Sequence, residues 1–130
     1  MPYHVDFDPI NRILRARFIG RVTDDDLRDV YRFGQENVER IDPLSGITDF
    51  SEATAVAFAP QTMRELARTK PIMPEPSRPV IFVAPIPDLF GMARIFELEG
   101  AEARPNLRVV RTAEEAYQIL NVRNPQFSPV

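Results

Sequence analysis

Few side chains in this sequence have the chemistry of a catalytic or metal site. His4 is the one histidine, and there is no cysteine, which excludes disulfides, thiolate catalysis and cysteine-ligated metals. A catalytic triad around His4, or a metal site built on several histidines, would need partner residues that the sequence does not show. No glycine-rich phosphate loop or nucleophile elbow occurs. The sequence therefore predicts no catalytic residue, no cofactor and no metal, and we interpret His4 as an exposed strand residue.

Three consecutive carboxylates, Asp24, Asp25 and Asp26, have the donor atoms that a hard cation prefers. Neighbouring residues of a helix point in different directions, so the three side chains cannot converge on one ion. Thr23 stands before them as a residue that can cap free N–H groups, and carboxylates favour the positive end of a helix dipole. We therefore interpret this run as a helix start rather than a metal site.

Asp49 and Ser51 are the best polar candidates for ligand binding. They lie at the end of a strand predicted over residues 47–50, and ligands of open α/β sheets gather at the carboxyl ends of strands. The alternative is that Asp49 caps a turn or pairs with a nearby arginine.

The segment 90–96 is a second candidate. Gly91 lies inside a helical pattern, where it costs up to about 1 kcal/mol relative to alanine. Close approach of a backbone or a ligand would offset that cost. Arg94 on the same helix has the fork geometry that holds a carboxylate or phosphate head group. The alternative is a tightly packed helix with Arg94 in a salt bridge.

Residues 53–60 form an uncharged stretch that is too apolar for an ordinary solvated loop. The stretch either lines an apolar pocket, forms a contact surface or folds into the core. Its Phe58 would line such a pocket together with Phe90 and Phe96. The complete set of candidate ligand-binding residues is Asp49, Ser51, Phe58, Phe90, Gly91, Arg94 and Phe96.

The elements that must position these residues follow from hydrophobic periodicity. Alternation over residues 3–7 and 14–18, across a turn at 8–12, predicts an antiparallel hairpin that Gly20 closes. Further strands are predicted at 47–50, 80–84 and 107–110. Helices are predicted from Thr23 to Asp42, behind Pro60, from Pro87 to Gly100, and after Thr112. The order β-β-α-β-α-β-α-β-α predicts an α/β fold with a mixed sheet of about five strands and four helices.

Length and composition predict one domain. The chain has 130 residues, 44% of them hydrophobic, with a formal net charge of −3. Residues 1–120 form the predicted domain, and residues 121–130 are expected to be a loose tail. The net negative charge and the scattered arginines argue against binding to nucleic acid. The longest apolar run, 79–87, is too short for a transmembrane segment, and no signal peptide is visible. We expect a cytoplasmic protein.

The element order, with segments 18–23, 48–51, 80–85, 90–96 and 109–112, resembles the STAS-like domain. The resemblance spans residues 3–120 and is to the SpoIIAA-like branch of anti-sigma-factor antagonists, also described as CRAL-TRIO-like. In classical antagonists the serine of an Asp-Ser pair at a helix start is phosphorylated. Here residues 57–62 read Ala-Phe-Ala-Pro-Gln-Thr. The resemblance therefore implies no phospho-acceptor serine, with Thr62 as a weak substitute.

Two functions remain open from the sequence. The resemblance implies a non-enzymatic regulatory or protein-interaction module, with a protein partner or a homodimer formed through the hairpin strand or the apolar third helix. The alternative is a carrier or sensor of a small apolar or lipid-like ligand. That function predicts a cavity between the second and third helices, with Arg94 as the head-group contact. An enzyme is the least favoured.

Overall fold

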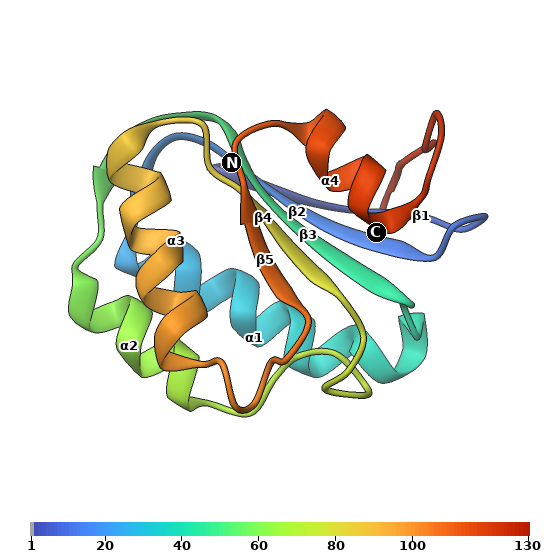
Figure 1. The fold of residues 1–130 in the computed structure, drawn as a ribbon, viewed down its shortest axis with the longest axis horizontal. Coiled ribbons are helices and arrows are strands. Elements are labelled where there is room, and N and C mark those ends of the chain that lie inside the picture. Colours follow the sequence, from blue (N-terminus) through green and yellow to red (C-terminus); the bar gives the residue numbers. More distant parts are fainter. Residues whose placement is uncertain (1) are drawn as a thin grey trace.

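The computed structural model describes residues 2–130 and arranges them as one mixed sheet between two helical layers (Figure 1). Helices α1, α2 and α3 cover one face of the sheet, and α4 covers the other. The elements are β1 (Tyr3–Asp8), β2 (Ile13–Thr23), α1 (Asp24–Ile41), β3 (Ser45–Ala57), α2 (Pro60–Arg68), β4 (Val80–Val83), α3 (Pro87–Glu99), β5 (Leu107–Val110), α4 (Ala113–Leu120) and β6 (Ser128–Pro129). The predicted α/β order and N-terminal hairpin are confirmed.

The strands lie in the order β5-β4-β3-β2-β1-β6. Strands β2 to β5 are parallel to one another, while β1 runs antiparallel to both β2 and β6. The hairpin turn is fixed by Asp8, whose carboxylate accepts the N–H groups of Ile10 and Asn11. Parallel neighbours place the carboxyl ends of β2, β3, β4 and β5 at the same end of the sheet.

The helices begin where the sequence predicts. Thr23 accepts the N–H of Asp26, and the Asp26 carboxylate accepts the N–H of Thr23, which makes a reciprocal cap for α1. Proline stands in the first turn of α2 and α3, where its missing N–H costs nothing. Thr112 caps α4 by accepting the N–H of Glu115.

Strands β2 and β3 are longer than the sequence predicts. The hairpin strand does not end at Gly20, because Gly20 pairs with Ala53 and, after a second register shift, residues 21–23 pair with residues 55–57. Gly20 has a φ of 72°, a left-handed value that glycine adopts without steric cost. The uncharged stretch after residue 52 is thus largely strand, with Ala53 buried against the helices. This pairing satisfies backbone groups that a loop would leave to water.

The tail is not loose, contrary to the expectation for residues 121–130. Ser128 and Pro129 pair with Phe7 and Asp6 of β1. The N–H of Gln126 donates to the Asp8 carboxylate at 3.2 Å. The Phe127 ring lies 3.7 Å from the guanidinium carbon of Arg15, within the range of a cation–π contact. These contacts hold the tail against the outer strand of the sheet.

Two separate cores pack on the two faces. Under α1, α2 and α3, four phenylalanines form a row of two stacked pairs, Phe18 with Phe50 and Phe82 with Phe96, each with ring centroids 5.0 Å apart. Phe50 and Phe82 meet edge to face between the pairs. The core under α4 is smaller and aliphatic. It consists of Ile13, Ile47, Ile81, Val83, Val110 and Ala116.

Candidate functional site

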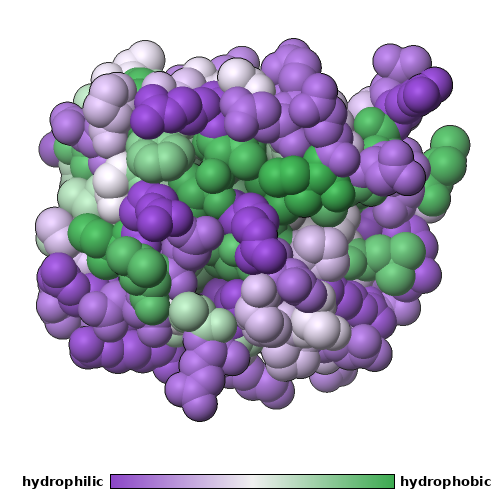
Figure 2. Space-filling view, viewed as in Figure 1, coloured by the Kyte–Doolittle hydropathy of each residue, from purple (hydrophilic) through white to green (hydrophobic). Residues whose placement is uncertain are grey.

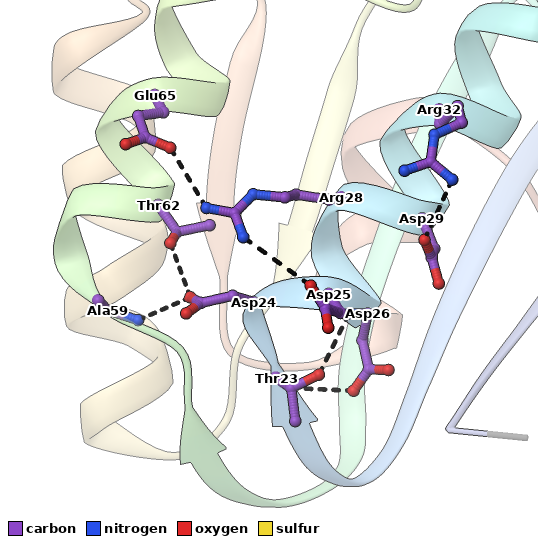
Figure 3. Close-up of polar contacts among 10 residues, drawn as sticks. All are labelled: Thr23, Asp24, Asp25, Asp26, Arg28, Asp29, Arg32, Ala59, Thr62 and Glu65. Carbon is purple, nitrogen blue, oxygen red and sulfur yellow. Dashed lines mark hydrogen bonds and ion pairs between the residues drawn. The ribbon is translucent and has the colours of Figure 1, made fainter.

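The start of α2 is joined to the start of α1 by a carboxylate (Figure 3). Asp24 accepts hydrogen bonds from the Thr62 hydroxyl at 2.7 Å and from the Ala59 N–H at 3.0 Å. The bond from Thr62, reinforced by the one from Ala59, lowers the pKa of the Asp24 carboxyl below its ordinary value of 3.8. Ala59 is the N-cap of α2 and has no capping side chain of its own. Asp24 therefore supplies the cap from another helix.

The other two carboxylates of the predicted helix start point elsewhere, as Figure 3 shows. Asp25 lies 3.9 Å from Arg28, and Asp26 bonds back to Thr23. Arg28 also reaches Glu65 of α2 at 3.4 Å. Within residues 2–130 no group of three or more potential metal ligands comes together. The prediction that this run starts a helix is confirmed.

Asp49 and Ser51 lie on the sheet away from the helical layer of α1 to α3. Asp49 is 8% exposed, and its carboxylate accepts the N–H of Ser51 at 2.8 Å. The bond lies inside β3, where the pairing with β2 shifts register, so these residues are neither at the carboxyl end of the strand nor in a turn, contrary to both expectations. Ligand binding at these two residues stays a prediction.

A charged network that the sequence analysis missed lies on the same face. Asp6 is 5% exposed and takes two hydrogen bonds from Arg15, at 2.9 and 2.8 Å. Arg17 lies 3.4 Å from Asp6 and 3.5 Å from Glu52. The signal was present in the hairpin register, because Asp6 and Arg15 stand directly opposite each other. Opposite charges at such positions attract.

The candidates on α3 do not form one site. Apart from its chain neighbours and the adjoining backbone of α3, no described atom lies within 4 Å of a Cβ built on Gly91, so the close approach of another backbone suggested by the sequence is absent. Arg94 pairs with Glu97 on the same helix. The guanidinium carbon of Arg111 lies 4.4 Å from the centre of the Phe90 ring. Phe96 is buried in the core, and Phe90 packs against the same core while partly exposed.

An apolar cavity of about 130 Å³ lies between the sheet and α1, whereas the carrier function predicted one between the second and third helices. Of the candidate residues, Phe96 lines this cavity, whereas Phe58 is buried elsewhere in the same core. The irregular segment 69–79 forms its outer wall through Pro71, Ile72 and Met73.

Arg104 is the residue of this region that sequence reasoning missed. It lines the cavity and is 7% exposed. Its guanidinium donates to the carbonyls of Ala67 at 2.7 Å, Thr69 at 3.1 Å and Leu66 at 3.3 Å. It also donates to the Tyr31 hydroxyl at 2.5 Å. The three carbonyls lie at the end of α2, whose negative dipole end favours a cation.

A glycine makes room for Arg104. A Cβ built on Gly100 would lie 3.0 Å from Nη1 of Arg104, tighter than an ordinary contact. The stacking of Arg104 over the Phe96 ring, 4.7 Å from its centre, holds the guanidinium from the other side. Arg104 lies beyond the last residue of α3, so the helical periodicity of that segment gave no signal for it.

Comparison with protein-family models and with curated proteins finds no match. Among solved structures, the phosphorylated form of the Bacillus cell fate determinant SpoIIAA is similar, with a TM-score of 0.53 and 15% sequence identity. The similarity covers 91% of this chain and 98% of that one. The chain has a STAS-like, SpoIIAA-like fold.

Within this STAS-like fold, Thr62 is poorly placed to accept a phosphate. It is 3% exposed, and its hydroxyl donates to the Asp24 carboxylate. A phosphate there would lose that bond and bring a second anion beside the first.

No helix within residues 2–130 combines the length and apolar character needed to cross a membrane.

Proposed function

We propose that this chain is a non-enzymatic, STAS-like regulatory or protein-interaction module that works without the usual phospho-acceptor serine. The observation that carries the proposal is the start of α2. By resemblance, classical antagonists have their phosphorylated serine at this helix start. Here Asp24 of α1 already places a carboxylate against the Ala59 N–H and the Thr62 hydroxyl. A permanent negative charge occupies a position where a helix start favours an anion.

A surface for a protein partner is available at the β5 edge of the sheet. Figure 2 shows apolar residues gathered in a band across the side of the molecule where α3, β5 and α4 face the viewer. Large apolar side chains of these helices are exposed, Leu98 at 67% and Ile119 at 49%. Strand β5 has a neighbour on one side only. Exposed apolar bands and unpaired strand edges are typical of protein interfaces, including those of homodimers.

The experiment is co-purification of the tagged protein from its own cells, with intact-mass analysis of the same sample. We expect a protein partner or a second copy at fixed stoichiometry, and a mass that includes no phosphate. Ile119→Glu is expected to reduce the bound partner. Ile10→Glu is the matched control, because Ile10 is 82% exposed at the hairpin turn. Phosphate on a serine or threonine, or equal loss of partner in both variants, would contradict the proposal.

A second function, a carrier or sensor of a small apolar ligand, is favoured by the apolar cavity. Its volume of about 130 Å³ suits a compact molecule. Pockets for drug-sized ligands have volumes of roughly 300–1,000 Å³, so a long lipid chain fits this function less well. Native mass spectrometry followed by organic extraction tests it. A reproducible extra mass that extracts into solvent is the expected result, and a bare protein from its own cells argues against it.

A further inference from the structure

The wall of the apolar cavity contains a buried cation that has no carboxylate partner. Arg104 makes no ion pair with any of residues 2–130, although it is 7% exposed. A guanidinium stays charged at every pH that a protein experiences. Its partners, three carbonyls and the Tyr31 hydroxyl, are dipoles rather than charges. They satisfy hydrogen bonds but leave a net positive charge beside the cavity.

The other groups around the cavity do not neutralise this charge. Two arginines and no aspartate or glutamate are among the described residues that line it. The second arginine, Arg78, is already bound to Asp42 at 2.8 Å. The hydrogen bonds of Arg104 all use Nη1 and Nη2, so no acceptor within residues 2–130 engages Nε. In a site of low dielectric an anion beside this group would be strongly stabilised.

We propose that the cavity binds a compact apolar carboxylate, with its hydrocarbon part in the hollow and its carboxylate at Arg104. The volume of about 130 Å³ sets the size. An apolar protein cavity of about 150 Å³ holds one benzene molecule, so a six-carbon ring or a short chain fits. This inference rests on the second function proposed above, binding of a small apolar ligand, and adds the chemical class of that ligand.

Capping of α2 by Arg104 is a structural role that the ligand role does not replace. The capping bonds reach backbone carbonyls through Nη1 and Nη2, whereas an incoming carboxylate would take Nε. A purely structural Arg104 affects stability but gives no preference among ligands of equal size and different charge. Charge selectivity is therefore the readout that separates the two roles.

The experiment is calorimetric titration of the full chain with three probes of similar size: benzoate, toluene and benzylammonium. We expect benzoate to bind about tenfold more tightly than toluene, the factor that one charge-assisted hydrogen bond supplies. We expect benzylammonium not to bind. If toluene binds as tightly as benzoate, the carboxylate inference is overturned while the apolar-ligand function stands. If neither probe binds, both are overturned.

Variants then locate the head group. Arg104→Met is expected to lose the preference for benzoate while retaining toluene, and Arg104→Lys to keep part of it. Arg94→Met is the matched control, because Arg94 lies on α3, is paired with Glu97 and does not line the cavity. Equal loss in Arg94→Met and Arg104→Met would overturn the assignment of the head group to Arg104.

A further variant keeps the test decisive if Arg104→Met fails to fold. A Cβ on Gly46, which lines the cavity, meets its nearest neighbour at 3.6 Å, an ordinary contact. Gly46→Ala should therefore fold and reduce the space for both benzoate and toluene. Unchanged affinity for benzoate in Gly46→Ala would place the ligand outside this cavity and overturn the proposal.

Discussion

The face of the sheet under α1, α2 and α3 is packed with stacked phenylalanines, whereas the opposite face carries a charged network over β1 and β2 beside a small aliphatic core. The aromatic face contains the cavity, and its apolar lining leaves few polar groups without partners there. The charged face depends on matched partners, since Asp6 is nearly buried between two arginines. The aromatic face thus leaves a hollow in its packing, whereas the charged face leaves a buried atom, Nε of Arg17, without a hydrogen-bond partner.

The aromatic face should show the largest effect of a single substitution. Phe50 is 1% exposed and stacks on Phe18. Phe50→Ala is expected to lower the free energy of unfolding by about 4 kcal/mol, the typical cost of such a truncation. Urea denaturation measures it. Ile47→Val, on the opposite face, should lower the free energy of unfolding by only about 1 kcal/mol. Equal losses of unfolding free energy for the two variants would contradict the larger contribution assigned to the aromatic core.

Breaking the charged network is expected to cost slightly less. Asp6→Ala leaves Arg15 without its bidentate partner in a site where the Arg15 side chain is 16% exposed. The expected loss is about 3 kcal/mol, the lower end for breaking a buried pair. The double variant Asp6→Leu with Arg15→Met should recover most of this loss in the same urea experiment. Failure to recover would show that the pair contributes net stability beyond the cost of an orphaned charge.

Two glycines on the aromatic face should respond oppositely to the same change. A Cβ on Gly34 would lie 2.7 Å from Ile72, while one on Gly46 meets nothing closer than 3.6 Å. Gly34→Ala is expected to destabilise by about 1–3 kcal/mol through overpacking. Gly46→Ala is expected to stabilise by about 0.4–1 kcal/mol through the unfolded state. The midpoints of thermal unfolding of both variants measure this difference. A lower stability for Gly46→Ala would contradict the space assigned to the cavity beside Gly46.

The smallest expected effect is the loss, in acid, of the stability that Asp8 supplies at the turn between β1 and β2. Burial alone would raise the pKa of Asp8, but hydrogen bonds from Asn11, Ile10 and Gln126 outweigh it and lower the pKa below its ordinary value of 3.8. The stability that Asp8 supplies is present above pH 3.8 and disappears as the pH falls through the lowered value. At neutral pH, Asp8→Asn should cost on the order of 1 kcal/mol. This difference should vanish in acid, and a difference that grows below pH 3.8 would contradict the shift.

Local signals predicted much of the fold. Each of these signals acts within a few residues of the chain: the alternation in the hairpin, the cap at Thr23, and the prolines in the first turns of α2 and α3. The length of β3 was not predictable in this way, because residues 53–57 become strand only through pairing with β2 across two register shifts. The tail likewise depends on β1, more than a hundred residues earlier in the chain.

The candidate site was predicted less well, because a cavity is a property of packing rather than of periodicity. Phe96 was recognised, yet Arg94 was chosen as the head-group contact instead of Arg104. Arg94 lies on α3, whereas Arg104 follows the helix beyond a turn, and only the tertiary fold shows that Arg104 reaches back to the end of α2. Gly91 was judged to need a close neighbour, whereas the glycine that makes room for a side chain is Gly100.

The pairing of β6 with β1 has a consequence for the order of folding. The β1–β2 hairpin joins residues adjacent in the chain and closes a short loop, which is fast and entropically inexpensive. Phe7 and Ser128, by contrast, can meet only after the entire intervening chain has been synthesised. On the ribosome, the outer edge of β1 therefore stays uncovered until residues 128 and 129 have been synthesised. During that interval it is a strand edge to which a neighbouring nascent chain can add.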